Sequence, residues 1–168
     1  MSVDLHEAAR RLIDMEGALL DRRQWDRWLT LYEEDAVFWV PAWRSDEEPT
    51  TDPARETSMI YLESRGALED RAWRLGTGRS LASAPLLRTS HVSGSVMVEE
   101  GVGGEVKAFS SWACHVFNVR NAQQHVFFGT ADYELVRRDA GRGGLGIRRK
   151  TATLLNDRVP SLLDFYCV

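Results

Sequence analysis

The second half of the chain holds four long strand-like segments separated by very short joins. These segments span residues 88–99, 105–120, 123–138 and 145–157. The joins read EGVGGE, RNAQ and DAGRGG, and such Gly-rich or turn-forming stretches are typical of β-hairpins. A join this short leaves no room for a crossover helix, so consecutive strands must pair antiparallel. This half of the chain therefore predicts an antiparallel sheet.

Alternation within the third segment indicates how the sheet is buried, because successive side chains point to opposite faces. One face is mostly apolar and carries His125, Phe127, Ala131, Tyr133 and Leu135. The other face carries Phe128 and Val136. These two side chains indicate that the second face is partly covered as well.

The first half of the chain shows helical spacing. Positions 5, 8, 9, 12, 16, 19 and 20 recur at helical intervals, and all are apolar except Glu16. Asp21 is a candidate cap for a second, shorter helix that ends near residues 33–35 and precedes a strand over 36–40. The apolar face of this second helix comprises Trp25, Trp28, Leu29 and Tyr32.

The middle of the chain is less regular. Residues 44–53 are polar and predict an exposed loop, while residues 57–63 fit either a strand or an early helix. Ser64 is a candidate cap for a third helix, in which Leu68, Ala72 and Leu75 keep helical spacing.

Helices followed by a curved antiparallel sheet make an α+β fold, and we expect one domain over residues 1–168. Helices packed on the concave face of such a sheet resemble the cystatin-like, nuclear-transport-factor-2-like cone. That fold hosts isomerases, dehydratases and structural subunits, so the fold alone does not define a function.

Charge and hydropathy exclude several classes of partner. The net charge of −4 gives no basic footprint for nucleic acid, and no apolar run approaches the thickness of a bilayer. The N-terminal stretch MSVDLHEAARR lacks the features of a signal peptide. Cys114 and Cys167 are too few for a disulfide framework. We expect a cytoplasmic protein that binds neither nucleic acid nor membrane.

The histidines form no recognisable metal motif. A Rieske cluster needs two Cys and two His at close spacing, and the chain has no Cys-x-His or Cys-x-x-His. His115 and His125 fall on neighbouring strands, but no carboxylate lies at a compelling offset, so we expect no metal site. Cys114 and His115 are adjacent in a strand and point to opposite faces, which disfavours a nucleophile–base pair.

His91 is the strongest candidate for chemistry. In a cone it could face the pocket and act as a general base, with Tyr32 or Asp35 as helper. The simpler interpretation is a structural histidine in a polar network with Arg88.

Three motifs carry a resemblance to a known family, namely LYEEDAVFWVPAW, LEDRAWRL and RTSH at residues 31–43, 68–75 and 88–91. From about Leu12 onward the chain resembles the small, beta subunit of bacterial aromatic-ring-hydroxylating dioxygenases. The FWVPAW stretch and the C-terminal part favour the subgroup that acts on benzoate, toluate, anthranilate and salicylate.

The resemblance implies a division of labour between subunits. A large alpha subunit is expected to carry a Rieske [2Fe–2S] cluster and a mononuclear non-haem iron. Electrons reach it from NADH or NADPH through a reductase, sometimes with a ferredoxin. Three alpha and three beta subunits commonly assemble, so this chain is expected to contact both alpha and other beta subunits, to bind no cofactor itself and to be non-catalytic.

The same motifs supply candidate subunit contacts. In the first motif, aromatic side chains suit an interface centre, and alternation predicts that one of Phe38 and Trp39 points inward and the other outward. The remaining candidates are Trp43, Glu69, Asp70, Arg71, Arg74, Arg88 and His91.

Two alternatives remain open from the sequence. One is a stand-alone isomerase or dehydratase of the same cone fold that uses His91, Tyr32 and Asp35. The other is a cone that only binds a ligand. The enzyme alternative requires those three side chains to line one pocket.

Overall fold

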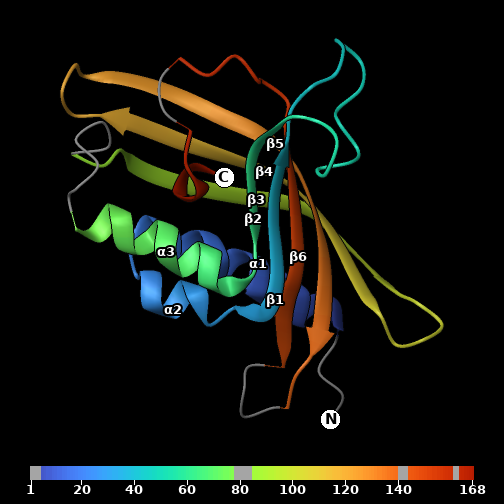
Figure 1. Cartoon of the computed structure of the whole chain (residues 1–168). Helices are drawn as coiled ribbons and strands as arrows, with labels where there is room; N and C mark the ends of the chain where they lie inside the picture. The colour runs from blue at the N-terminus through green and yellow to red at the C-terminus, as the bar shows by residue number, and fades with distance from the viewer. Residues whose placement is uncertain (1–4, 78–84, 140–143, 161–162) are drawn as a thin grey trace.

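The computed structural model describes residues 5–77, 85–139, 144–160 and 163–168, and its centre is one six-stranded sheet (Figure 1). The strands lie in the order β2-β1-β6-β5-β4-β3. Their bounds are β1 Tyr32–Pro41, β2 Ser58–Glu63, β3 Arg88–Glu100, β4 Val106–Asn118, β5 Gln123–Arg137 and β6 Leu145–Leu154. The helices are α1 Leu5–Asp21, α2 Trp25–Leu29 and α3 Arg65–Gly76, and η2 is a 3₁₀ turn over Phe165–Cys167.

The predicted antiparallel strands are confirmed as β3 to β6. Each of these strands pairs with the next one along the chain in antiparallel register. The join DAGRGG falls largely on residues 140–143, which lie outside the described residues. Residues 58–63 form a strand, which resolves the ambiguity of that segment, and β1 joins the sheet by pairing in parallel with β6.

The second helix is shorter than the sequence pattern predicts. It ends at Leu29, and Tyr32 already belongs to β1. Asp21 is not its cap, because Asp21 is the last residue of α1 and Gln24 occupies the cap position of α2. The predicted helix is too long because Tyr32 belongs to the sheet, where its backbone pairs with Ile147 of β6.

The cap and stripe of the third helix are confirmed. The Ser64 side chain accepts a hydrogen bond from the Ala67 backbone N–H at 3.3 Å. Leu68, Ala72 and Leu75 are all buried.

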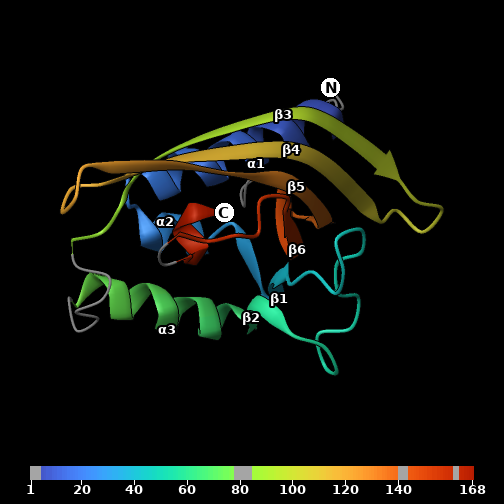
Figure 2. The same ribbon diagram turned by 90° about the horizontal axis from the view of Figure 1, so that it is seen from above.

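The helices and the C-terminal turn gather on one side of the curved sheet, with α1 against β3 and α3 against β1 (Figure 2). The inner face of β4 alternates as expected and buries Val106, Ala108, Trp112, Cys114 and Val116. The opposite face is partly covered, as the sequence indicates, since Phe128 is 45% exposed and Val136 is half-buried.

Two glycines allow close approaches that shape the cone. A Cβ on Gly17 of α1 would lie 2.9 Å from the Cβ of His91, so glycine lets α1 approach β3. A Cβ on Gly129 of β5 would overlap the carbonyl oxygen of Thr153 on β6.

Candidate functional site

The interior of the cone holds a buried ion pair where the fold offers space for a pocket. Lys150 Nζ of β6 lies 3.0 Å from Glu16 Oε1 of α1. The two side chains are only 5% and 3% exposed. The Lys150 ammonium also lies 5.4 Å from the centre of the Phe38 ring and 5.8 Å from that of Tyr133.

Two tyrosines complete the hydrogen bonding of Glu16. Tyr32 donates to Oε1, and Tyr133 donates to Oε2 at 3.1 Å. Burial, followed by the nearby charge of Glu16, raises the pKa of both phenols well above the usual value. Both groups therefore remain protonated donors, and neither is suited to be a general base near neutral pH.

The last residues of the chain fill the remaining space beside this network. We call residues 164–168 the C-terminal plug; Figure 1 shows it as the red turn between the helices and the sheet. Phe165 stacks on Trp28 with ring centroids 4.8 Å apart, and Lys150 Nζ donates to the backbone oxygen of Val168 at 3.1 Å. Arg71 binds both carboxylate oxygens of Asp164, at 3.0 and 3.2 Å.

The residues required by the isomerase alternative do not converge. Tyr32 is tied to Glu16 in the interior, while Asp35 is exposed and lies 3.4 Å from Arg148. His91 lies on β3, at the opposite edge of the sheet from β2. The geometry therefore gives no support to a catalytic group made of these three side chains.

His91 is a structural residue, as the simpler interpretation predicted, but its partner is Asp21 and not Arg88. Its backbone N–H donates to Asp21 Oδ2 at 2.8 Å, and its Nδ1 lies 2.6 Å from Oδ1. Burial raises the pKa of Asp21, but the hydrogen bonds from His91 outweigh it and hold that pKa below its usual value. The contact ties the end of α1 to β3.

The strand histidines do not share a metal site. In the register of β4 and β5, His115 pairs with Val126 and His125 pairs with Val116, so the two rings leave opposite faces of the sheet. Within the described parts of the chain, no group of three His, Cys, Asp or Glu side chains is placed to hold a metal ion. Cys114 and Cys167 are buried and unpaired, and burial raises the pKa of Cys167 to about 12.

The aromatic interface candidates are used within the chain itself. Phe38 is fully buried, and Trp39 is 6% exposed although it points to the other face of the sheet. The Trp39 indole donates to Ser58 Oγ at 2.8 Å and lies under the Arg149 guanidinium. The two rings leave opposite faces of the sheet, as alternation predicts, but the outward ring of Trp39 is covered by other parts of the same chain. Trp43 is half-buried and donates to the Leu154 carbonyl at 2.7 Å.

Of the charged interface candidates on α3, two form ion pairs within the chain and two are exposed. Glu69 forms an ion pair with Arg65 at 3.1 Å, and Arg71 is held by Asp164 of the same chain. Asp70 and Arg74 are exposed. On β3, Arg88 is also exposed and lies over the Phe117 ring at 6.0 Å.

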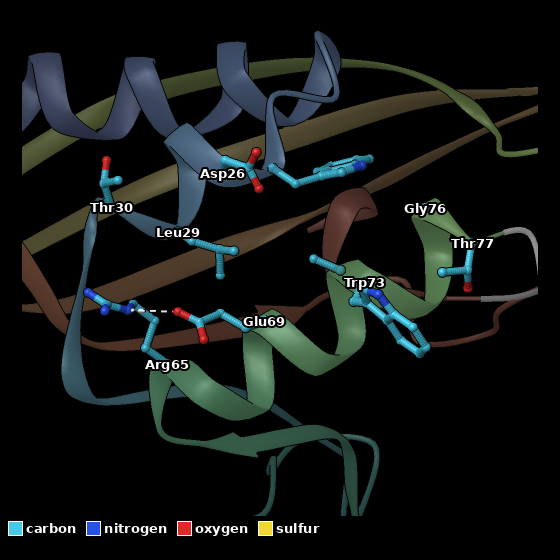
Figure 3. A pocket seen from close by; sticks show the side chains of 10 residues that line it. Asp26, Leu29, Thr30, Arg65, Glu69, Trp73, Gly76 and Thr77 are labelled. Atoms are coloured by element: carbon cyan, nitrogen blue, oxygen red, sulfur yellow. Dashed lines mark hydrogen bonds and ion pairs between the residues drawn. The ribbon is translucent and has the colours of Figure 1, made fainter.

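A groove between α2 and α3 has a volume of about 680 Å³ (Figure 3). Its lining includes Trp25, Asp26, Leu29, Arg65, Glu69 and Trp73, and we call it the α2–α3 groove. Trp73 is 60% exposed at its rim. The sequence contained a signal for this residue, since Trp73 falls outside the buried stripe of α3.

The buried ion pair was also missed, although Glu16 stands out as the one charge in the apolar stripe of α1. A charge at such a position signals a buried partner. The partner is not visible locally, because Lys150 lies 134 positions away.

Fold and interior together define a class: an α+β cone whose interior is occupied by its own side chains. The α+β expectation is confirmed, and a hexachlorocyclohexane dehydrochlorinase shares the fold with a TM-score of 0.61 at 16% identity, covering 90% of this chain and 89% of that one. The model of the family "Ring hydroxylating beta subunit" matches residues 15–161. The chain belongs to this family of dioxygenase beta subunits.

Two relatives support the expected subgroup. The anthranilate 1,2-dioxygenase small subunit of Acinetobacter baylyi is 37% identical, and the match covers 100% of both chains. The solved beta subunit of benzoate 1,2-dioxygenase from Burkholderia mallei superposes with a TM-score of 0.77 at 31% identity, covering 100% of this chain and 99% of that one. Within the described residues, no helix is long and apolar enough to span a membrane.

Proposed function

We propose that this chain is the structural small subunit of an oxygenase that hydroxylates a benzoate-like or anthranilate-like aromatic acid. The observation that carries the proposal is the filled interior. Glu16, Lys150 and the C-terminal plug occupy the place where a cone-shaped enzyme would hold its substrate. The chemistry then belongs to the partner, and the names of the relatives supply the substrate class and favour dioxygenation.

The partner follows from the family. We infer a large alpha subunit that carries a Rieske [2Fe–2S] cluster and a mononuclear non-haem iron, in an assembly of three alpha and three beta subunits. A reductase, with or without a ferredoxin, supplies electrons from NADH or NADPH in the cytoplasm. The two free buried cysteines are consistent with a reducing compartment. This chain contributes packing surfaces and holds no step of the reaction.

The burial of each interface candidate separates residues that pack within the chain from residues that remain at the surface. Phe38 and His91 act within the chain, where they support the strands that carry the surface. Asp70, Arg74, Arg88 and Trp43 remain open or half-buried and are the better candidates for direct contact with another subunit. Exposed ion pairs of this kind contribute about 0–1 kcal/mol each, so they would set register more than affinity.

Purification of the chain at native expression tests the proposal, with native mass and iron measured on the product. The expected result is recovery with a larger iron–sulfur protein in equal numbers, all iron being in that partner. The complex should convert benzoate or anthranilate to an oxygenated product when reductase and NADH are added. Recovery of this chain alone, with no partner, would contradict the subunit function.

A further inference from the structure

The outer face of β3, β4 and β5 is turned away from the described helices, which lie on the other side of the sheet (Figure 2). Its centre is an apolar row fixed by the strand register, in which Val92 pairs with Ala113 and Ala113 pairs with Phe128. Leu155 extends the row, because its backbone N–H donates to the Phe128 carbonyl at 2.9 Å. Val92, Phe128 and Leu155 are 56%, 45% and 48% exposed. Contiguous exposed apolar side chains of this kind mark interaction sites on soluble proteins.

The two rows that flank this apolar row on β3 to β5 hold no acidic side chain, lysine or arginine. One row comprises Ser90, His115 and Val126, and the other comprises Gly94, Ser111 and Thr130. We call these three rows the uncharged band. Small and uncharged side chains let another surface approach closely, and the cores of protein interfaces are depleted of charge. The uncharged band therefore suits contact with a protein surface.

Opposite charges lie beyond the two ends of the uncharged band. Arg88 of β3 shares its row with Phe117 of β4, and Asp132 of β5 shares its row with Phe109 of β4. These two rows lie at equal offsets from Ala113 along β4, on opposite sides of it. The row beyond Asp132 adds Glu99, Lys107 and Glu134, so this end stays net acidic on β3 to β5. One face thus carries a basic end and an acidic end.

Neither Arg88 nor Asp132 is neutralised by the described part of the chain. Arg88 is exposed, and its guanidinium lies 6.0 Å from the centre of the Phe117 ring but pairs with no described carboxylate. The Asp132 carboxylate forms no hydrogen bond or ion pair with a described residue. Partial burial raises the pKa of Asp132, so a cation from another molecule would relieve the cost of its ionised form.

We propose that the outer face of the sheet is the contact between copies of this chain, with Arg88 of one copy paired to Asp132 of the next. The same face supplies both members of the pair, which a different partner would have to provide separately. A surface with complementary ends fits a second copy of itself, and head-to-tail contacts of this kind close into rings. The inference deepens the proposed function, on which the number of three copies rests, and names the surface where those copies meet.

Sedimentation equilibrium of the isolated chain, at low and high salt, tests this inference. The wild-type chain should self-associate, and Arg88→Asp and Asp132→Arg should each raise the dissociation constant about tenfold or more, because each places like charges together. The double variant Arg88→Asp with Asp132→Arg restores opposite charges across the contact. It should return to within about threefold of the wild-type value at low salt.

Two further variants separate the contact from general effects of charge. Phe128→Asp places an unpaired charge in the uncharged band and should raise the dissociation constant about tenfold or more. Arg10→Asp with Asp14→Arg reverses an exposed ion pair on α1 and is the matched control, which should change nothing. Circular dichroism of each variant verifies folding, which the exposure of Arg88, Phe128 and Asp132 leaves intact.

The outcomes separate this inference from the proposed function. A wild-type chain that stays monomeric overturns the inference, as does a double variant that associates no better than the single variants. If the variants weaken binding of a large iron–sulfur partner and leave self-association unchanged, the outer face belongs to that partner and the inference is wrong. If the wild-type chain self-associates as expected but binds no such partner, the proposed function fails and the contact between copies stands.

Discussion

Lys150 and Glu16 form an ion pair of 3.0 Å in the interior of the cone, with side chains 5% and 3% exposed. A stand-alone enzyme of this fold would need a pocket in the same space. Here two tyrosines and the backbone of Val168 satisfy the remaining hydrogen bonds of the pair. The interior is thus a closed polar core.

Removing one member of this pair should destabilise the chain strongly. Lys150→Met leaves the Glu16 carboxylate buried without its cation, and such losses cost about 3–5 kcal/mol. Urea denaturation of the isolated chain measures the change. The double variant Glu16→Gln with Lys150→Met removes both charges and keeps acceptors for the tyrosines, so it should recover most of the lost stability. An equal loss in the double variant would show that charge compensation is not the cause.

Gly17 should not tolerate a side chain. In Gly17→Ala the new Cβ lies 2.9 Å from the Cβ of His91, so α1 must shift away from β3. We expect a loss of about 1–3 kcal/mol in the free energy of unfolding, as for other overpacked sites. Gly76→Ala is the control, because a Cβ there meets no atom within 4 Å. Equal stability of the Gly17 and Gly76 variants would contradict tight packing of α1 on β3.

The Asp21–His91 contact should make stability depend on acid pH. The pKa of Asp21 is lowered in the folded state, so its contribution is present above the unfolded pKa of about 3.9 and is lost as pH falls through the folded pKa. The wild-type chain should exceed Asp21→Asn in stability by on the order of 1 kcal/mol at pH 6, and the gap should close as pH falls through the lowered pKa of folded Asp21. Denaturation midpoints across this range test the expectation, and a gap independent of pH would refute it.

Ionisation of Asp132 on β5 should destabilise the fold, whereas ionisation of Asp21 stabilises it. Burial raises the pKa of Asp132 in the folded state, so the ionised form destabilises the fold at neutral pH. Asp132→Asn should therefore be more stable than the wild-type chain at pH 7, by less than about 1 kcal/mol because the side chain is exposed. The advantage should disappear below about pH 4, where both states are protonated. A loss of stability at pH 7 would mean that the carboxylate has a favourable contact on the sheet.

Trp39 and Trp73 should behave differently when truncated. Trp39→Ala removes a 6% exposed side chain and should cost about 3–5 kcal/mol of unfolding free energy. Trp73→Ala removes a 60% exposed side chain and should change stability by less than about 0.5 kcal/mol. Thermal melts of both variants compare them directly. A large loss for Trp73→Ala would show that the indole packs more tightly than its exposed fraction indicates.

Local patterns in the sequence determined much of the architecture. The short joins required antiparallel pairing of β3 to β6, and the Ser64 cap with its three-residue stripe located α3. The motifs at residues 31–43, 68–75 and 88–91 indicated the family to which the chain belongs. The hairpins and the capped helix depend on neighbours a few positions apart, so backbone propensity and periodicity are sufficient to indicate them.

The tertiary structure alone decided how the interior and the surface are used. Lys150 meets Glu16 across 134 positions, β1 pairs in parallel with β6, and the C-terminal plug reaches Trp28. Alternation correctly separated Phe38 from Trp39, but it could not indicate that Ser58 and Arg149 cover the second ring. Burial depends on which distant segments pack together, and a periodic pattern gives only the face from which a side chain leaves the backbone.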